Sequence, residues 1–255
     1  MNGTPPLGRR RILVTGAGSG IGQATVERLV GDGARVAMLD LQFTNEVDGE
    51  HRSGRPTPVR IVADVSIEAS IQAGVMSAAD QLGGLDGVVT CAGIQLFGRD
   101  SAAEDLALET WQRTIDVNLT GTFLSVKHAI PHLRAAGGGS IVCICSPTGA
   151  RGSAPGFDAY SASKGGVAGL VRVLAADYAP ANIRVNGLMP GFTFTPLVRS
   201  ITEDSDIQNS VVSRIPLGRP GRPEEVASCV AFLLGDDASY VTASILVADG
   251  GFTGV

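Results

Sequence analysis

Residues 11–22, RILVTGAGSGIG, decide the fold. The apolar run over 11–15 predicts a short buried strand, and a helical pattern over 20–31 follows directly. Between them lies a turn rich in glycine, a residue that lets the backbone approach a ligand closely. The N-terminus of the following helix offers free N–H groups and the positive end of a dipole. The stretch therefore predicts a strand–turn–helix unit whose turn binds a phosphate group.

The spacing of the glycines narrows the kind of turn. A strict G-x-G-x-x-G fingerprint fails, because Ile21 and Gln23 occupy the position of the third glycine in the two possible registers. No G-K-[ST] follows, so the turn is not a P-loop and ATP is disfavoured. A dinucleotide site is the functional interpretation, and a purely structural tight turn is the alternative.

The rest of the chain repeats the alternation of strand and helix. Short β-branched apolar runs predict further strands over 35–39, 59–63, 87–91, 140–145, 184–188 and 244–248. Helical patterns lie between them, near 67–82, 110–136, 158–179 and 223–234. The alternation predicts an α/β fold, with a doubly wound sheet of about seven parallel strands and helices on both faces.

We expect a single domain over residues 1–255, because no linker, repeat or low-complexity tract divides the chain. Residues 1–9 are expected to form a flexible N-terminus, and the polar stretch 41–58 is expected to be a loop. Residues 190–222 are rich in proline and lack periodicity. We therefore predict a substrate loop or lid over 192–215, after the carboxyl end of a strand, where open α/β sheets bind their ligands.

Composition argues against several classes of protein. The net charge of −5 gives no basic face, so nucleic acid is not an expected partner. No apolar stretch reaches the length of about 20 residues that crosses a membrane, so we expect a cytoplasmic protein without a membrane partner. The cysteines lack metal-binding spacing and are expected to be buried free thiols. His128 and His132 have helical spacing but no third ligand, so no metal site is predicted.

Asp40 ends the second predicted strand, 24 residues after Gly16. An acid at this place hydrogen-bonds the ribose hydroxyls of a bound dinucleotide. A carboxylate there repels a 2′-phosphate, and neither Ala17 nor Leu41 supplies a cation to attract one. NAD(H) is therefore favoured over NADP(H) as the cofactor. The alternative is that Asp40 only caps a strand end.

Lys164 is one of only two lysines in the chain, and it lies four residues after Tyr160 in DAYSASKGG, residues 158–166. This spacing places both side chains on one face of a helix. A free phenol ionises at about pH 10, and an adjacent ammonium stabilises the phenolate. The pair is therefore a candidate acid–base centre, with an ordinary, partly buried helical pair as the alternative.

These residues belong to a set of motifs that runs in order from Arg11 to Gly251. The set comprises Thr15, Gly16, Gly20 and Gly22 in T-G-x-x-x-G-x-G, Asp64-Val65, Cys91-Ala92-Gly93, Asn118 in IDVNLTG, Ser146 in IVCICSPTG, Tyr160 and Lys164, Pro190, Gly191 and Thr195 in P-G-x-x-x-T, and the late VADGG. In these motifs the chain resembles a classical short-chain dehydrogenase/reductase. The resemblance implies a Rossmann-type fold and an NAD(P)-dependent oxidoreductase acting on CH–OH groups.

The resemblance also implies a role for each motif. The implied cofactor-binding residues are Gly16, Ser19, Gly20, Ile21, Gly22, Asp40, Asp64, Val65, Cys91, Ala92, Gly93, Tyr160, Lys164, Pro190, Gly191, Thr193 and Thr195. Tyr160 is implied to act as general acid in carbonyl reduction and as general base in alcohol oxidation, while Ser146 hydrogen-bonds the substrate oxygen. Lys164 is implied to bind the nicotinamide ribose and stabilise the tyrosinate. Asn118 is implied to hold a water that continues a proton relay from Lys164.

Three features depart from the family pattern. Cys91 replaces the asparagine of N-A-G, which we expect to alter local stability rather than activity. Thr193 stands where isoleucine or valine is common, and its main-chain contacts with the cofactor should survive. Ser146 and Tyr160 are 14 residues apart, a longer spacing than is common in the family. We therefore expect a bulge beside the substrate within ARGSAPGFD, residues 150–158.

We predict an NAD(H)-dependent oxidoreductase that interconverts a secondary alcohol and a ketone by hydride transfer. The expected substrate-pocket residues are Gln95, Ser146, Pro147, Ser153, Phe157 and Phe192. Gln95 and Ser153 suit a polyol or a sugar derivative, whereas the two phenylalanines equally suit a cyclic alcohol. The alternatives are an NADPH-dependent ketone or 3-oxoacyl reductase of secondary metabolism and, from another class, a non-catalytic nucleotide-binding regulator.

The resemblance implies a homotetramer formed through the two helices over 110–136 and 158–179, with a dimer as the second expectation. The stretch SASKGGVAGLVRVLAAD, residues 161–177, is rich in alanine and glycine and is compatible with close packing of helices between subunits. The expected partners are therefore a small-molecule alcohol or ketone and further copies of the chain.

Overall fold

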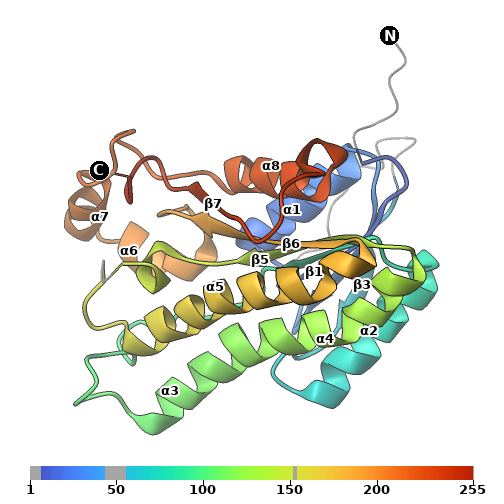
Figure 1. Cartoon of the computed structure of the whole chain (residues 1–255). Helices are drawn as coiled ribbons and strands as arrows, with labels where there is room; N and C mark the ends of the chain where they lie inside the picture. The colour runs from blue at the N-terminus through green and yellow to red at the C-terminus, as the bar shows by residue number, and fades with distance from the viewer. Residues whose placement is uncertain (1–6, 44–55, 152–153, 255) are drawn as a thin grey trace.

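The computed structural model describes residues 7–43, 56–151 and 154–254, and within these ranges one seven-stranded sheet organises the chain (Figure 1). Its strands are β1 (Arg11–Thr15), β2 (Arg35–Asp40), β3 (Val59–Val62), β4 (Gly87–Thr90), β5 (Gly139–Ile144), β6 (Ile183–Pro190) and β7 (Ile245–Ala248). Every neighbouring pair is parallel, in the order β3-β2-β1-β4-β5-β6-β7. The predicted Rossmann-type sheet is confirmed.

Helices cover both faces of the sheet (Figure 1). On one face lie α1 (Gly20–Gly31) and α8 (Pro223–Leu234), and on the other α2 (Glu68–Leu82), α4 (Gly121–Ala135) and α5 (Asp158–Tyr178). The helix predicted over 110–136 consists of three consecutive segments: α3 (Leu108–Ile115), a π-helical stretch (Asp116–Thr120) and α4. The wider π-helical turn marks the place where Asn118 enters the protein interior.

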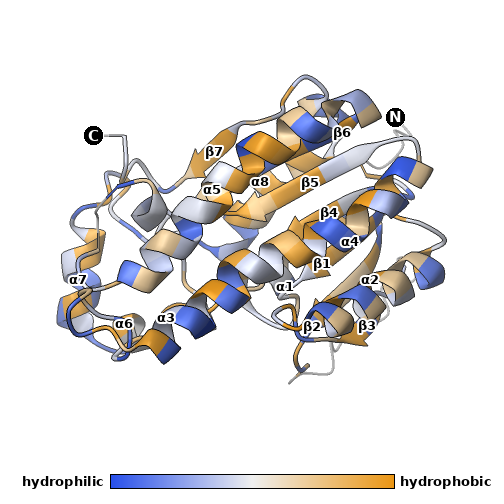
Figure 2. Ribbon diagram, turned by 60° about the horizontal axis from the view of Figure 1, so that its bottom comes forward, coloured by the Kyte–Doolittle hydropathy of each residue, from blue (hydrophilic) through white to orange (hydrophobic). Residues whose placement is uncertain are grey.

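Side chains of the central strands alternate between two apolar layers. Leu13 and Ile141 pack in the layer of α2, α4 and α5, whereas Ile12 and Val142 pack in the layer of α1 and α8. All four side chains are fully buried. Because both faces are covered, these strands are continuous apolar runs rather than alternating ones, and they are largely orange in Figure 2. This two-sided burial fixes the strand ends that carry the site.

The segment expected to be an irregular loop over 192–215 contains two short helices, α6 (Arg199–Thr202) and α7 (Ser205–Val212). Helix α7 forms without a buried apolar stripe because Asp204 caps it. The Asp204 carboxylate accepts hydrogen bonds of 3.0 Å from two backbone N–H groups of the first turn. The segment is therefore an ordered wall of short helices.

Two other expected loops fall partly outside the described residues. Of the N-terminal segment 1–9, residues 1–6 lie outside, but Leu7 is only 1% exposed and its N–H bonds to the carbonyl oxygen of Asp32. Residues 7–9 are thus packed onto the fold, because Leu7 completes the layer of α1 and α8. Residues 44–55, most of the expected loop over 41–58, also lie outside the described residues.

Candidate active site

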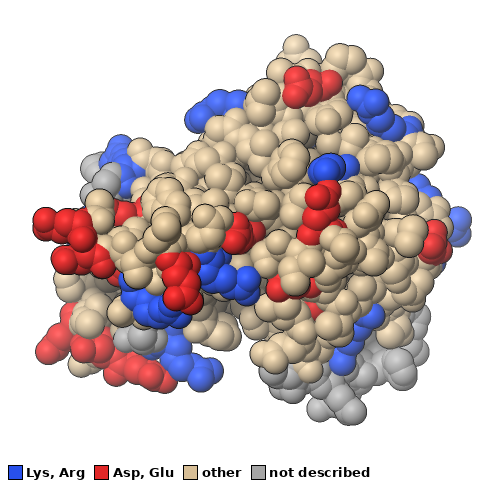
Figure 3. All heavy atoms as spheres, turned by 90° about the horizontal axis from the view of Figure 1, so that it is seen from below, with Lys and Arg blue, Asp and Glu red and all other residues tan. Residues whose placement is uncertain are grey.

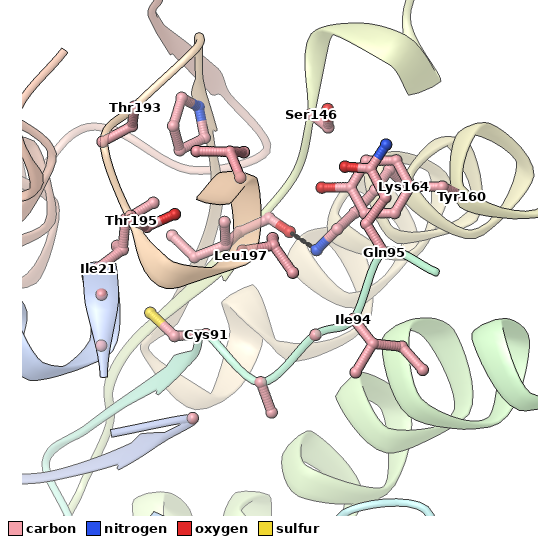
Figure 4. Close-up of a pocket in the computed structure, with 18 of the residues that line it drawn as sticks. Ile21, Cys91, Ile94, Gln95, Ser146, Tyr160, Lys164, Thr193, Thr195 and Leu197 are labelled. Atoms are coloured by element: carbon pink, nitrogen blue, oxygen red, sulfur yellow. Dashed lines mark hydrogen bonds between the residues drawn. The ribbon is translucent and has the colours of Figure 1, made fainter. Parts of the chain in front are cut away.

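A cavity of about 440 Å³ lies at the carboxyl edge of the sheet (Figure 4). Its walls include one residue from the carboxyl end of each strand, in the order β1 to β6: Gly16, Asp40, Asp64, Cys91, Ser146 and Gly191. The strand order reverses between β1 and β4, and open α/β sheets bind ligands at this switch point. The fold therefore converges on this cavity from chain segments far apart in sequence.

The glycine-rich turn forms one end of the cavity. The predicted turn residues Gly16, Ser19, Gly20, Ile21 and Gly22 all line it. Gly16 has φ 65°, and a Cβ there would lie 2.5 Å from the nitrogen of Ala92. A Cβ on Gly22 would lie 2.0 Å from the oxygen of Gly16. These positions therefore require glycine, and the tight turn leaves the start of α1 open toward the cavity.

Asp40 and Asp64 bring carboxylates to the β2–β3 side of the cavity. Asp40 Oδ2 accepts a 2.8 Å hydrogen bond from the Gly18 N–H, and Oδ1 accepts a 2.7 Å bond from the Leu41 N–H. Asp64 Oδ1 accepts hydrogen bonds from the backbone and hydroxyl of Ser66. Both carboxylates are thus oriented by the protein, and their remaining lone pairs are free to accept hydrogen bonds from a ligand.

Cys91, Ala92 and Gly93 follow β4 and line the cavity beside the glycine turn. The Cys91 N–H bonds to the oxygen of Thr15, and the Ala92 N–H lies 3.4 Å from the Thr15 hydroxyl. These bonds hold the end of β4 against β1 whatever side chain stands at position 91. Burial of the Cys91 thiol raises its pKa to about 12. The cysteine is therefore a neutral, weakly polar part of the wall.

Tyr160 and Lys164 project from α5 into the cavity beside Ser146, as Figure 4 shows. Lys164 is 4% exposed, and its Nζ donates a 2.9 Å hydrogen bond to the oxygen of Ile144 at the end of β5. The same Nζ lies 5.9 Å from the centre of the Tyr160 ring. Ser146 Oγ lies 3.1 Å from the hydroxyl of Thr148. A buried ammonium, a phenol and a hydroxyl thus share one side of the cavity.

Asn118 lies behind this wall and is not a lining residue. Its Oδ1 accepts a 2.8 Å bond from the Ile94 N–H, and its Nδ2 donates to the Ile94 oxygen at 2.9 Å and to the Ser163 hydroxyl at 3.1 Å. A Cβ on Gly93 would lie 3.3 Å from Asn118 Oδ1 and 3.6 Å from Lys164 Nζ. The amide therefore ties the loop after β4 to α5, close to the lysine.

The residues after β6 close the cavity on its other side. The predicted residues Pro190, Gly191, Thr193 and Thr195 all line it. Thr193 is buried, its hydroxyl bonds to the Gly191 oxygen at 3.0 Å, and its backbone bridges to Gly221. A Cβ on Gly191 would lie 2.6 Å from the Cα of Asp249, so this backbone passes close to the turn after β7.

The expected substrate residues lie together in the described structure, with one outside it. Gln95, Ser146, Pro147, Phe157 and Phe192 line the cavity, and Ser153 lies outside the described residues, as does Gly152 of the expected bulge. The remaining wall is mostly apolar and includes residues that sequence reasoning did not name individually: Ile94, Ala154, Leu197, Val198, Ile201, Val211, Arg214, Ile215 and Phe252. Phe252 carried no sequence signal, because it follows the last recognised motif.

Asp100 is a buried residue that the sequence did not single out. Its Oδ1 accepts a 3.1 Å hydrogen bond from the Ala159 N–H, and its Oδ2 accepts a 2.9 Å bond from the Tyr160 N–H. These donors lie in the first turn of α5, whose own N-cap residue Phe157 supplies no capping side chain. Asp100 therefore caps, from a distant loop, the helix that presents the tyrosine.

Charged side chains on the surface are mixed in sign. Figure 3 shows basic and acidic residues interspersed on the face turned to the viewer. His128 Nε2 lies 3.3 Å from Glu68 Oε1, and Lys127 Nζ donates to the same oxygen. Across the described residues, no three His, Cys, Asp or Glu side chains are grouped as metal ligands would be. Nor does any helix in those ranges combine the length and apolarity needed to span a bilayer.

Comparisons with known proteins agree with this geometry. A family model described as enoyl-(acyl carrier protein) reductase matches residues 16–253. The cis-4-hydroxycyclohexanecarboxylate dehydrogenase of Sinomonas cyclohexanicum is 41% identical over 247 residues, covering 96% of this chain and 97% of that protein. The cyclohexanol dehydrogenase of Acinetobacter sp. is 39% identical over 243 residues, or 94% of each chain. The structure of a short-chain type dehydrogenase/reductase from Mycobacterium ulcerans has a TM-score of 0.90 and 33% identity, covering 96% of this chain and 90% of that one.

Proposed function

Because the chain belongs to the short-chain dehydrogenase/reductase family, as its motifs predicted, we propose that it oxidises a secondary alcohol on a ring to the ketone with NAD. The family and the relatives make it an oxidoreductase that acts on CH–OH groups with NAD(P). The choice of NAD over NADP and the cyclic substrate are the parts that we propose. The same site would catalyse the reverse reduction.

The grouping of Tyr160, Lys164 and Ser146 on one side of the cavity is the observation that carries the reaction. In oxidation, the tyrosinate oxygen takes the proton of the substrate hydroxyl, and in reduction the phenol returns it. The Ser146 hydroxyl hydrogen-bonds the substrate oxygen and stabilises the charge that develops there. The Lys164 ammonium stabilises the tyrosinate, because its Nζ is held near the ring by the Ile144 oxygen.

The residues of the cavity fit a dinucleotide. A Cβ at Gly16 or Gly22 would strike backbone, so the turn has the close approach that a pyrophosphate at the start of α1 needs. When bound there, NAD would supply the acceptor for the hydride that leaves the carbinol carbon. Asp40 favours NAD, because its carboxylate accepts hydrogen bonds from ribose hydroxyls and repels a 2′-phosphate. Asn118 would act on this site by holding the loop after β4 beside Lys164, and its predicted water relay stays part of the proposal.

The apolar wall supports a cyclic substrate. Phe157 and Phe192 face the same cavity as the aliphatic side chains of Ile94, Val198 and Ile201. A ring packs against such a wall, whereas a polyol needs a hydrogen-bond partner for each hydroxyl that it buries. The relatives named for cyclohexanol and hydroxycyclohexanecarboxylate support the same choice.

A homotetramer remains our proposal for the assembly, with a dimer second. Phe123 on α4 and Val173 on α5 are 43% and 51% exposed, which leaves apolar surface on the two helices expected to pair. Sedimentation equilibrium of the full chain would test this, and a monomer at micromolar concentration would refute it.

A substrate panel followed by NADH absorbance at alkaline pH tests the proposed function. Tyr160→Phe should lower kcat for cyclohexanol by about a hundredfold or more and leave NADH binding intact. Tyr178→Phe is the matched control, because Tyr178 ends the same helix and stacks with Arg134 outside the cavity. Binding of NADH without turnover of any alcohol would favour a non-catalytic regulator. Tighter binding of NADPH than of NADH would refute the role given to Asp40.

A further inference from the structure

Charged side chains are distributed unevenly around the cavity. The lining carboxylates, Asp40 and Asp64, lie at the carboxyl ends of β2 and β3 at one end of the sheet. Arg113 also lies at that end, where its guanidinium donates to the Ser66 hydroxyl beside Asp64. Lys164 is held by the Ile144 oxygen next to Tyr160. Asp40, Asp64 and Arg113 thus belong to the end of the cavity proposed for the cofactor, and Lys164 belongs to the proposed acid–base centre.

Arg214 lines the opposite wall, which is built by the segment after α7 and the turn after β7. Its Cζ lies 4.9 Å from the centre of the Phe252 ring. Within the described ranges, no hydrogen bond or ion pair engages the guanidinium, and its lining neighbours Val211 and Ile215 are apolar. The residue is exposed, so it stands at the mouth of the cavity. It is a cation whose five N–H donors have no acceptor among the described residues of the protein.

The backbone that carries Arg214 and the backbone that carries Phe252 are each fixed by contacts of their own. Asp249 is 8% exposed, and its carboxylate accepts bonds of 2.8, 2.8 and 2.6 Å from the Gly251 N–H, the Thr253 N–H and the Thr253 hydroxyl. These bonds shape the turn that carries Phe252. On the other side Ile215 is buried, next to Arg214 in the chain.

The two sides are also joined to each other. The Leu217 N–H bonds to the Gly250 oxygen at 3.1 Å, and a Cβ on Gly250 would lie 2.7 Å from Ile215 Cγ2. The segment that carries Arg214 is thereby packed onto the turn that carries Phe252. The ring face of Phe252 supports the guanidinium from one side, and within the described ranges its N–H groups bond to no protein atom. The donors are thus held in place before any ligand arrives.

Resting on the ring-alcohol oxidation proposed above, we infer that the substrate also carries a carboxylate, which Arg214 binds at the mouth of the cavity. A planar carboxylate matches the guanidinium fork with two parallel hydrogen bonds. Its single negative charge balances that of Arg214, the cation among the described lining residues of this wall, whereas a phosphate dianion would leave charge unbalanced against an apolar wall. Bound substrate covers the pair from water, which strengthens it beyond an exposed ion pair.

A matched pair of ring alcohols tests the inference in the wild-type enzyme. The pair is 4-hydroxycyclohexane carboxylate and the corresponding carboxamide, which differ in charge but little in shape. The wild type should have a kcat/KM about tenfold or more higher for the carboxylate, as expected for a charge-assisted hydrogen-bonded pair. The difference should lie mainly in KM, because the proposed pair with Arg214 binds the carboxylate equally in the ground state and in the transition state. Equal values for the two compounds would overturn the inference.

Arg214→Gln tests the residue. The ratio of the two kcat/KM values should fall toward one, and because both are measured on the same protein, a partial loss of folding does not change the ratio. Arg214→Lys should give an intermediate ratio, since lysine keeps the charge but not the fork. Arg60→Gln is the matched control: Arg60 also stacks on a phenylalanine, with its Cζ 5.5 Å from the Phe43 ring centre, but is not a lining residue. It should leave the ratio unchanged.

The outcomes separate this inference from the proposed function. If NADH binds but neither these compounds nor uncharged cyclohexanol is oxidised, the proposed function fails. If cyclohexanol and both probes are oxidised and the carboxylate has no advantage, only the carboxylate site fails. If Arg214→Gln weakens NADH binding as much as it weakens turnover of the carboxylate, the cation serves the cofactor, and the inference is again overturned.

Discussion

Replacing Asp100 by alanine should destabilise the protein through the helix that carries Tyr160. The carboxylate is 7% exposed and accepts the Ala159 and Tyr160 N–H groups at 3.1 and 2.9 Å. Each hydrogen bond to a charged acceptor contributes about 1.5–3 kcal/mol, and relief of the buried charge offsets part of the total. We expect a loss of about 3 kcal/mol in the free energy of unfolding. In a chain of this length, that lowers Tm by about 6–12 °C.

Thermal unfolding followed by circular dichroism measures the effect. Asp100→Asn should lose about half as much, because the amide oxygen still accepts one hydrogen bond and asparagine caps helices well. Asp105→Ala is the control from the same loop, since Asp105 is exposed and its side chain has no bond within the described residues. It should change the free energy of unfolding by about 0.5 kcal/mol or less. A Tm for Asp100→Ala within about 1–2 °C of the wild type, which is the largest shift expected for the Asp105→Ala control, would refute the capping role.

The same variants report whether the cap positions the tyrosine. Loss of the cap loosens the first turn of α5, so kcat for a ring alcohol should fall more than KM for NAD rises. Asp100→Asn should recover part of kcat. A loss of stability with kcat unchanged would make Asp100 a purely structural cap.

Three further predictions concern the turn, a thiol and an ion pair. Gly22→Ala should abolish NADH binding in a fluorescence titration, because the new Cβ would lie 2.0 Å from a backbone oxygen of the turn; retained binding would contradict the steric argument. Cys91, whose pKa burial raises to about 12, should be alkylated by iodoacetamide at pH 8 more slowly than Cys229, which is likewise partly exposed, as judged by mass spectrometry. Burial alone would raise the pKa of Asp86, but hydrogen bonds from Arg11 lower it overall. The Asp86 carboxylate therefore stabilises the folded protein fully above about pH 4, the pKa of a free aspartate, and this stabilisation is lost as the pH falls through the lowered pKa of the folded state. Asp86→Asn should therefore cost about 2 kcal/mol in urea unfolding at pH 7 and less at pH 3, and an equal cost at both would contradict the assignment.

Local patterns in the sequence predicted most of the fold. The strand over 11–15 and the helices over 20–31 and 223–234 have the predicted bounds, because turns and caps mark their ends. The π-helical stretch inside the helix predicted over 110–136 was not predicted, since one wider turn hardly alters an apolar stripe. Helix α7 was taken for loop because its helical character depends on one cap rather than on periodicity.

The residues of the site also divide into those that a local sequence pattern predicts and those that only the folded arrangement brings together. Tyr160 and Lys164 were predicted to lie together because a spacing of four on a helix puts two side chains on one face, and both line the cavity. Asp100 was missed because its partner N–H groups lie 59 and 60 residues away, a distance over which no periodicity acts. Arg214 and Phe252 meet only because two turns pack on each other, and neither residue type signals that contact. Contacts between loops depend on the folded arrangement and leave no local trace.

The placement of α6, α7 and the final turn outside the sheet has a consequence for substrate specificity. The parts that we propose hold the dinucleotide and move the proton are anchored in strands and long helices, where most replacements disturb the core. The parts that we propose meet the remainder of the alcohol belong to the segment that carries α6 and α7 and to the turn after β7. On the proposed function, replacements in these two segments would change which alcohol is accepted while leaving the groups that carry out the oxidation in place.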